Sequence, residues 1–204
     1  MFKVEILKCN GCRATISLSN TTCEYCGSEN IVTSYEKPCN LDQKISKQYI
    51  NFYKSKLQTN PSDENSLFAL GLFYLNLKLY DLAVKTFEKS MDINPEDSEI
   101  HYYYALSMIK GRRPKVLTLK EIQVIEKFIN SAIQLGDKAK YYYLAALINH
   151  DFYLGNGLKV PEPNYDELLK NATNSEIESD ENKMILTNVI VREQIFIEIL
   201  EKKQ

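Results

Sequence analysis

The sequence predicts a mainly α-helical fold, in which antiparallel helix hairpins stack into a solenoid that is preceded by a small β unit binding a metal ion. Three observations lead to this prediction. Four cysteines gather in two closely spaced pairs near the start of the chain. The dipeptide Asn60-Pro61 recurs as Asn94-Pro95, an offset of 34 residues. The 204 residues include only 7 glycines and 6 prolines but 14 tyrosines, which is typical of helices with large contact faces.

Composition and charge indicate an ordinary soluble globular protein. Hydrophobic residues make up 44% of the chain, charged residues 25%, and the formal net charge is −2. The first forty residues carry as many acidic as basic side chains, so nucleic-acid binding through bulk charge is disfavoured. No apolar run reaches the roughly 20 residues that span a bilayer, and charges interrupt the first apolar stretch. We therefore expect a cytoplasmic protein with no membrane partner.

The four clustered cysteines form Cys9-x-x-Cys12 and Cys23-x-x-Cys26, with ten residues between the pairs. In a reducing compartment, paired motifs of this kind indicate metal or redox chemistry rather than disulfides. Four thiolates suit one tetrahedral Zn²⁺ and leave no open position, so we predict a structural zinc site. A thiol-redox role and iron in place of zinc are the alternatives. Cys39 lies outside the pattern and is interpreted as a spare thiol.

Short stretches with alternating apolar residues surround the cysteine pairs, at residues 2–6 and 16–18, and each predicts a strand. Together with Gly27 after the second pair, they make residues 1–36 resemble a zinc ribbon, a small sheet with a metal knuckle at one end. Arg13 stands where that family often has glycine after the first pair. A unit this small cannot fold on apolar burial alone, so metal binding should supply most of its folding energy.

The offset of 34 residues is the tetratricopeptide period. Residues 64–97 resemble one tetratricopeptide repeat, although Leu67 stands where tryptophan is common and Ser90 where alanine is common. A single hairpin cannot bury its apolar face, so neighbouring hairpins must stack on it. The positions that carry the resemblance are Leu67, Leu70, Gly71, Tyr74, Ala83, Phe87 and Pro95.

Weaker copies of this pattern flank the repeat. We expect a helix over residues 42–59 before it and two further hairpins after it, the second with a shortened partner helix. The loop at residues 111–118 is longer than the family has. The hairpin helices are expected to open at 101–106 and 141–146, with partners at 119–135 and 165–172. The resulting domains are a zinc ribbon at 1–36, tetratricopeptide-like repeats at 41–154, and a C-terminal helical extension or cap at 155–204.

The resemblance implies that the first helix of each hairpin lines a concave groove. The expected lining is mostly apolar and aromatic, which suits an amphipathic helix or an extended peptide. We therefore predict a protein–protein interaction adaptor that binds a protein or peptide. The alternative is a nucleic-acid-associated factor, in which the ribbon contacts the polymer and the repeats recruit protein. The groove residues by the family's pattern are Asn65, Phe68, Leu72, Asn76, Tyr102, Leu106, Lys110, Tyr142, Ala146, Asn149 and His150.

Residues 185–200 predict one C-terminal helix whose apolar face is wider than a single stripe. Such a helix could cap the array, occupy the groove or form a homodimer, and we favour the cap because solenoids need capped ends. The polar, acidic residues 171–182 should connect it to the repeats. The basic loop Lys110–Lys115 is interpreted as solvated, with an acidic or phosphate contact as the alternative.

Catalytic motifs do not occur in the sequence. It contains no glycine-rich phosphate loop and no nucleophile motif. Of its two histidines, His101 falls at a helix-packing position and His150 at a groove position. We therefore predict that the protein is not an enzyme.

Overall fold

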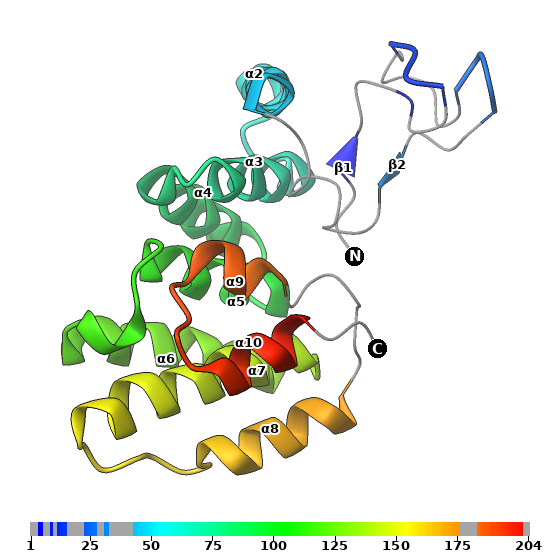
Figure 1. Ribbon diagram of the computed structural model, residues 1–204. Coiled ribbons are helices and arrows are strands. Elements are labelled where there is room, and N and C mark those ends of the chain that lie inside the picture. Colours follow the sequence, from blue (N-terminus) through cyan, green and yellow to red (C-terminus); the bar gives the residue numbers. More distant parts are fainter. Residues whose placement is uncertain are drawn as a thin grey trace.

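The computed structural model describes residues 4–5, 9, 12–15, 23–27, 31–32, 43–175 and 183–201. The described part of the chain is mainly helical, as predicted (Figure 1). The strand expected at residues 16–18, Cys39 and most of the acidic connector lie outside the described residues.

Seven helices follow one another along the array, and each packs against the next. This serial packing agrees with a solenoid, in which every hairpin contacts only its neighbours. The helices expected at 42–59, 119–135 and 165–172 are confirmed to within two residues. The seven are α2 (Gln43–Thr59), α3 (Glu64–Asn76), α4 (Tyr80–Ile93), α5 (Ser98–Ile109), α6 (Leu119–Leu135), α7 (Ala139–Ile148) and α8 (Tyr165–Asn174).

Three short irregular helices interrupt the array. The loop before α6 holds the 3₁₀ turn η1 (Pro114–Val116). The C-terminal end of α7 continues into the π-helical turn η2 (Asn149–Tyr153) and then into the 3₁₀ turn η3 (Leu154–Asn156). A π turn adds one residue to a helical turn and so changes the direction of the side chains that follow. His150 and Asp151 both lie in this turn, and their contacts are described below.

Local capping fixes where several helices begin. The Asp97 carboxylate accepts hydrogen bonds from the first backbone N–H groups of α5, and Asn164 does the same for α8. Thr118 and Glu121 form a reciprocal capping box at the start of α6. The backbone N–H of Thr118 and the side chain of Arg112 lower the pKa of Glu121 to about 2, so this carboxylate is charged at neutral pH.

The hairpin of α3 and α4 crosses at Gly71, against the ring of Phe87. A Cβ atom at Gly71 would lie 2.7 Å from Phe87 Cε1, so only glycine allows this approach. Phe87 is fully buried and its ring packs on Phe68 and Tyr103, at centroid distances of 5.9 and 6.1 Å. Gly71 and Phe87 therefore pack as their sizes predict: the glycine allows the close crossing, and the ring fills the space beside it.

Ring contacts extend this core along the array. Tyr49 of α2 stacks on Phe73 of α3 with centroids 4.8 Å apart. Farther along, Tyr104 of α5 meets Phe128 of α6 at 4.5 Å, and Tyr102 of α5 meets Tyr141 of α7 at 5.2 Å. The abundance of tyrosine thus has a structural cause, since these rings bridge successive helices.

A buried lysine links α5 to α7. Lys140 is only 2% exposed, and its Nζ lies 2.6 Å from a Glu99 carboxylate oxygen. The ammonium group also sits over the rings of Tyr102, Tyr103 and Tyr141, at 5.1 to 5.6 Å from their centroids. Nothing in the helical periodicity predicted this pair, because its members are 41 residues apart.

The C-terminal segment differs from its prediction as one helix. It forms two short helices, α9 (Lys183–Asn188) and α10 (Gln194–Glu201), with non-helical backbone at 189–193. Three consecutive β-branched residues at 189–191 weaken the helix there. In addition, the Ile190 N–H donates to the Arg112 carbonyl at 3.3 Å, and Glu193 pairs with Arg113 at 2.7 Å. Tertiary contacts of the interrupted stretch therefore replace helical hydrogen bonds.

This segment folds back onto the array (Figure 1). Helix α9 packs against α5, and Phe196 of α10 lies against His150 with ring centroids 5.4 Å apart. His150 in turn meets Tyr165 of α8 at 5.1 Å. The apolar side chains of Met184, Ile185, Val189, Phe196 and Leu200 are all buried. The segment thus packs on α5 through α9 and on the π turn after α7 through α10.

We predict that Gly71→Ala destabilises the protein. The added methyl group must displace the buried Phe87 ring, at a cost of about 1–3 kcal/mol, which exceeds the roughly 1 kcal/mol that alanine gains in a helix. Thermal unfolding should show a midpoint lower by a few degrees.

The double variant Gly71→Ala/Phe87→Leu serves as the control for this prediction. It should lose less stability than the two single changes add up to, because the smaller side chain removes the clash. Simple additivity would contradict the close crossing.

Candidate functional site

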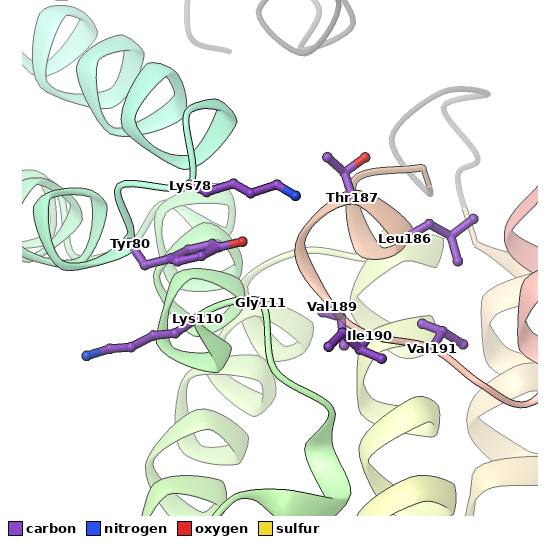
Figure 2. Close-up of a pocket in the computed structure, with 9 residues that line it drawn as sticks. All are labelled: Lys78, Tyr80, Lys110, Gly111, Leu186, Thr187, Val189, Ile190 and Val191. Atoms are coloured by element: carbon purple, nitrogen blue, oxygen red, sulfur yellow. The ribbon is translucent and has the colours of Figure 1, made fainter.

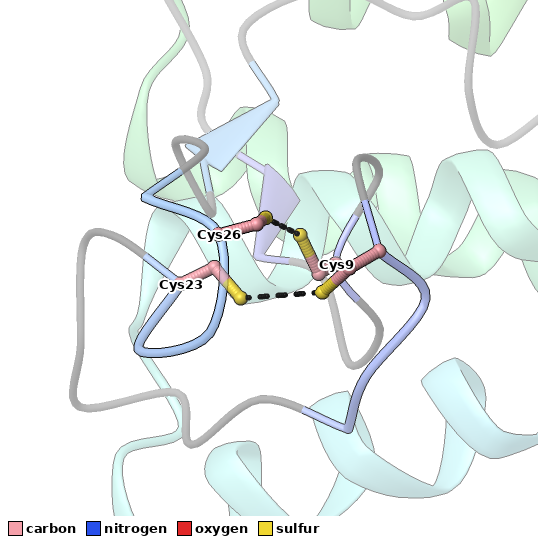
Figure 3. A group of neighbouring side chains, drawn as sticks. Cys9, Cys23 and Cys26 are labelled. Atoms are coloured by element: carbon pink, nitrogen blue, oxygen red, sulfur yellow. Dashed lines mark hydrogen bonds between the residues drawn. The ribbon is translucent and has the colours of Figure 1, made fainter.

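The four paired cysteines converge on one point. Their sulfur atoms all lie within 4.8 Å of one another. Cys9 and Cys26 Sγ are 3.3 Å apart (Figure 3). Cys12 and Cys23 Sγ are 3.7 Å apart. Sulfurs around a tetrahedral zinc ion, with bonds of about 2.3 Å, are separated by about 3.8 Å. The cluster is therefore close enough and of the right size to hold a metal ion.

Both cysteine pairs are presented by the same kind of turn. The Arg13 N–H donates to the Cys9 carbonyl at 2.9 Å, and the Gly27 N–H donates to the Cys23 carbonyl at 2.9 Å. The residue that follows each pair is left-handed, with φ of 60° at Arg13 and 72° at Gly27. Arg13 therefore has the same left-handed backbone conformation as Gly27, although it is not a glycine.

Two short strands close the base of this unit. β1 (Val4–Glu5) precedes the first pair, β2 (Ile31–Val32) follows the second, and they pair antiparallel with Val4 opposite Val32. The pairing brings together the chain on both outer sides of the cysteine cluster. This agrees with the β unit expected at the N-terminus.

The sulfur atoms differ in their surroundings. Cys9 and Cys23 are buried, whereas Cys12 and Cys26 are exposed. The backbone N–H of Ala14 lowers the pKa of the Cys12 thiol, but desolvation and the three neighbouring cysteines raise it to about 12. Hydrogen bonds with the neighbouring thiols and desolvation both favour the protonated form, so this thiol resists ionisation. A coordinated dication reverses this balance, since it deprotonates the thiols that bind it.

The eleven predicted groove residues separate into covered and accessible groups. Asn65 and Lys110 are exposed, and Asn76, Tyr142 and His150 are partly exposed. The other six are buried in this structure, and Phe68 and Tyr102 are buried among aromatic rings of the array itself, so a partner cannot reach them in this arrangement. The buried six are Phe68, Leu72, Tyr102, Leu106, Ala146 and Asn149.

Several of these side chains are engaged within the chain. Asn76 donates to the Ser46 hydroxyl on α2 at 3.3 Å, and Asn149 donates to the Pro163 carbonyl at 2.9 Å. His150 lies between Tyr165 and Phe196. The face formed by α3, α5 and α7, which we call the repeat face, is therefore partly occupied by the protein itself.

The basic loop before α6 is held by carboxylates of the same chain. Lys110 pairs with Asp81 at 2.6 Å, and Arg112 pairs with Glu121 at 2.8 Å. Arg113 contacts both oxygens of the almost fully buried Asp151 and also one oxygen of Glu193. Of the expected alternatives, a solvated loop or an acidic or phosphate contact, the acidic contact agrees with these pairs, and the carboxylates belong to the same chain.

The Arg113 contacts were beyond the reach of sequence patterns. Asp151 is 38 residues from Arg113 and Glu193 is 80 residues away. The signal in the sequence is the density of positive charge in this loop, which favours pairing with carboxylates without indicating which ones. The other histidine, His101, is buried and hydrogen-bonded to the Pro95 carbonyl at 2.7 Å, in agreement with a packing role.

No protein-family model matches the chain, and no curated protein matches it. Among the described residues, no helix combines the length and the apolar character needed to cross a membrane. The fold and the cysteine geometry therefore carry the functional argument.

We predict opposite effects of two exchanges at the cysteine turns. Arg13→Gly should tighten metal binding, and Gly27→Ala should weaken it, each by about 1 kcal/mol or roughly fivefold. The cause is backbone strain, since a Cβ atom at Gly27 would meet no atom within 4 Å. Competition with a chromophoric chelator measures both affinities. A shift in the same direction for both variants would contradict the left-handed geometry.

Proposed function

We propose that this protein is a non-catalytic interaction adaptor, with a tetratricopeptide-like array that binds a helical segment of a partner on the repeat face. A structural Zn²⁺ in a zinc-ribbon-like unit would stabilise the N-terminus. The observation that carries the proposal is that the repeat face already holds a helical segment, supplied by residues 183–201 of the same chain.

The contacts of that segment define what the face recognises. Apolar side chains of α9 and α10 are buried, with Phe196 against His150 and Tyr165. One acidic side chain, Glu193, reaches the Arg113 guanidinium, which the buried Asp151 holds in place. A partner of the same chemistry would be an amphipathic helix that carries large apolar residues and one carboxylate.

Occupation in cis sets the conditions for binding in trans. A tethered segment has an effective concentration in the millimolar range, so a free partner must compete with it. The apparent affinity then falls by the fraction of molecules whose face is open. The adaptor would therefore bind a partner strongly only when that partner outcompetes residues 183–201 or when the segment is released.

The dimer considered from the sequence needs the same segment. Its buried apolar side chains now contact the chain to which they belong, so dimerisation through it would require an exchange between two copies. The nucleic-acid alternative gains no support from the loop before α6, because Lys110, Arg112 and Arg113 are already paired with carboxylates.

The zinc site is tested by metal content. We expect one Zn²⁺ per chain in native mass spectrometry, and Cys9→Ser/Cys12→Ser should abolish it. Chelation should unfold the N-terminal unit. The far-ultraviolet circular dichroism of the helical array should stay nearly unchanged. Iron would instead give a coloured protein. Full retention of the metal by the double variant would contradict coordination by the cluster.

A labelled peptide of residues 183–201 tests binding to the repeat face. It should bind wild-type protein weakly, because the tethered copy competes. Phe196→Ala in the protein weakens that competitor and should tighten binding of the wild-type peptide by about tenfold or more. Fluorescence anisotropy measures the affinity, and Glu193→Gln provides a milder second variant.

The control is a peptide that itself carries Phe196→Ala, which should bind poorly to every form of the protein. Equal affinity of the two peptides would contradict the proposal. So would identical peptide binding by the wild-type, Phe196→Ala and Glu193→Gln proteins, provided that circular dichroism shows all three to be folded.

A further inference from the structure

A hollow of about 420 Å³ lies where the turn between α3 and α4, the end of α5 and the C-terminal segment meet. Polar groups from two sides point into it (Figure 2). Lys78 extends its ammonium group toward Thr187 of α9, and the Tyr80 hydroxyl points into the same space. Val189 and Ile190 supply apolar walls. Lys110 also lines the hollow but is paired with Asp81, so among the described residues the hollow holds one cation without a carboxylate partner, two hydroxyl groups and an apolar surface.

Unusual backbone conformations shape the hollow. Lys78 is left-handed, with φ of 58°, which costs a residue with a side chain about 1 kcal/mol relative to glycine. Its turn is closed by the Leu79 N–H, which donates to the Tyr74 carbonyl at 2.8 Å. Gly111 is also left-handed, and a Cβ atom there would lie 2.7 Å from the Tyr80 hydroxyl oxygen. Lysine is therefore present where the fold alone would favour glycine.

A second hollow of about 310 Å³ continues from the first across Ile190. Arg192 and Val116 belong to its lining, and the exposed fractions of Ile190 and Val116 are 50% and 66%. The two hollows, which we call the double hollow, therefore share an exposed apolar ridge at Ile190. Lys78 and the paired Lys110 line one hollow, and Arg192 lines the other together with the paired Arg112 and Arg113.

The carboxylates around the double hollow are already paired with other cations. The nearby carboxylates of Asp81, Glu121, Asp151 and Glu193 are all engaged by Lys110, Arg112 and Arg113. Within the part of the chain that the structure describes, neither Lys78 nor Arg192 has a carboxylate partner.

The helix dipoles explain only some of this positive charge. They favour a cation after the C-terminal ends of α3 and α5, which accounts for Lys78 and Lys110. Arg192 precedes the N-terminus of α10, where a cation is unfavourable. The fold therefore gains nothing evident from Arg192, and an external anion would.

We propose that the double hollow binds an acidic, extended segment of another protein. One carboxylate would pair with Lys78 and accept a hydrogen bond from Tyr80, and a second would pair with Arg192. An apolar side chain between them would cover Ile190. A protein segment fits better than nucleic acid, because exposed apolar surface separates the two cations and the net charge of the chain is −2. Thr187, Ile190 and Arg192 belong to residues 183–201, so a partner that displaces this segment from the repeat face would also remove one wall of the double hollow.

Fluorescence anisotropy with the full chain tests the proposal. The probe is a short labelled peptide that alternates glutamate with leucine, and the matched control peptide has glutamine in place of glutamate. The acidic peptide should bind, with an affinity that falls as salt rises. Lys78→Gln and Arg192→Gln should each weaken it by roughly tenfold. Lys89→Gln, at an exposed position of α4, should leave the affinity unchanged.

Lys78→Gly separates binding from folding. Glycine relieves the left-handed strain and should raise the melting temperature, while the peptide affinity falls as in Lys78→Gln. Four outcomes would overturn the proposal: no binding of the acidic peptide, equal binding of the glutamine peptide, no effect of the Lys78 and Arg192 variants, or Lys78-dependent binding of oligothymidylate alone. None of them bears on the repeat face, which is probed with a different peptide.

Discussion

Aromatic packing between successive helices is the interaction on which the rest of this structure depends. The Phe87 ring reaches the α3 backbone because residue 71 has no side chain. The same ring packs against Phe68 and Tyr103. From there, ring contacts continue to α6 and α7. Since each hairpin is too small to bury its own apolar face, the array exists only as this continuous stack. Every surface discussed above is positioned by it.

The same stack explains why a charged pair can be buried beside it. Lys140 is enclosed by three tyrosine rings and neutralised by Glu99, which also accepts a hydrogen bond from Tyr141 at 2.7 Å. A buried cation without that carboxylate would be severely unfavourable, so the pair also fixes the register of α5 against α7. The register in turn determines the shape of the repeat face, to which both helices contribute.

Arg113 connects the array to its C-terminal segment. Asp151 is placed for this role by the π turn that ends α7, and Glu193 is placed by the break between α9 and α10. One guanidinium thus satisfies two carboxylates from distant parts of the chain and ties the covering segment to the surface beneath it. Residues 110–113 therefore line the double hollow and also hold the C-terminal segment that covers the repeat face.

The sequence by itself determined the helices and the cysteine cluster, because both depend on short-range patterns. Capping residues, a period of 34 residues and small residues at the hairpin crossing are local signals, and two CxxC turns bring their own sulfurs together. Only the tertiary structure decided what covers the repeat face and where the loop cations go. Those outcomes rest on pairs such as Arg113 with Glu193, 80 residues apart, and on competition between helix propensity and tertiary contacts at 189–193. No local pattern encodes either one, since each is settled by the geometry of the assembled array.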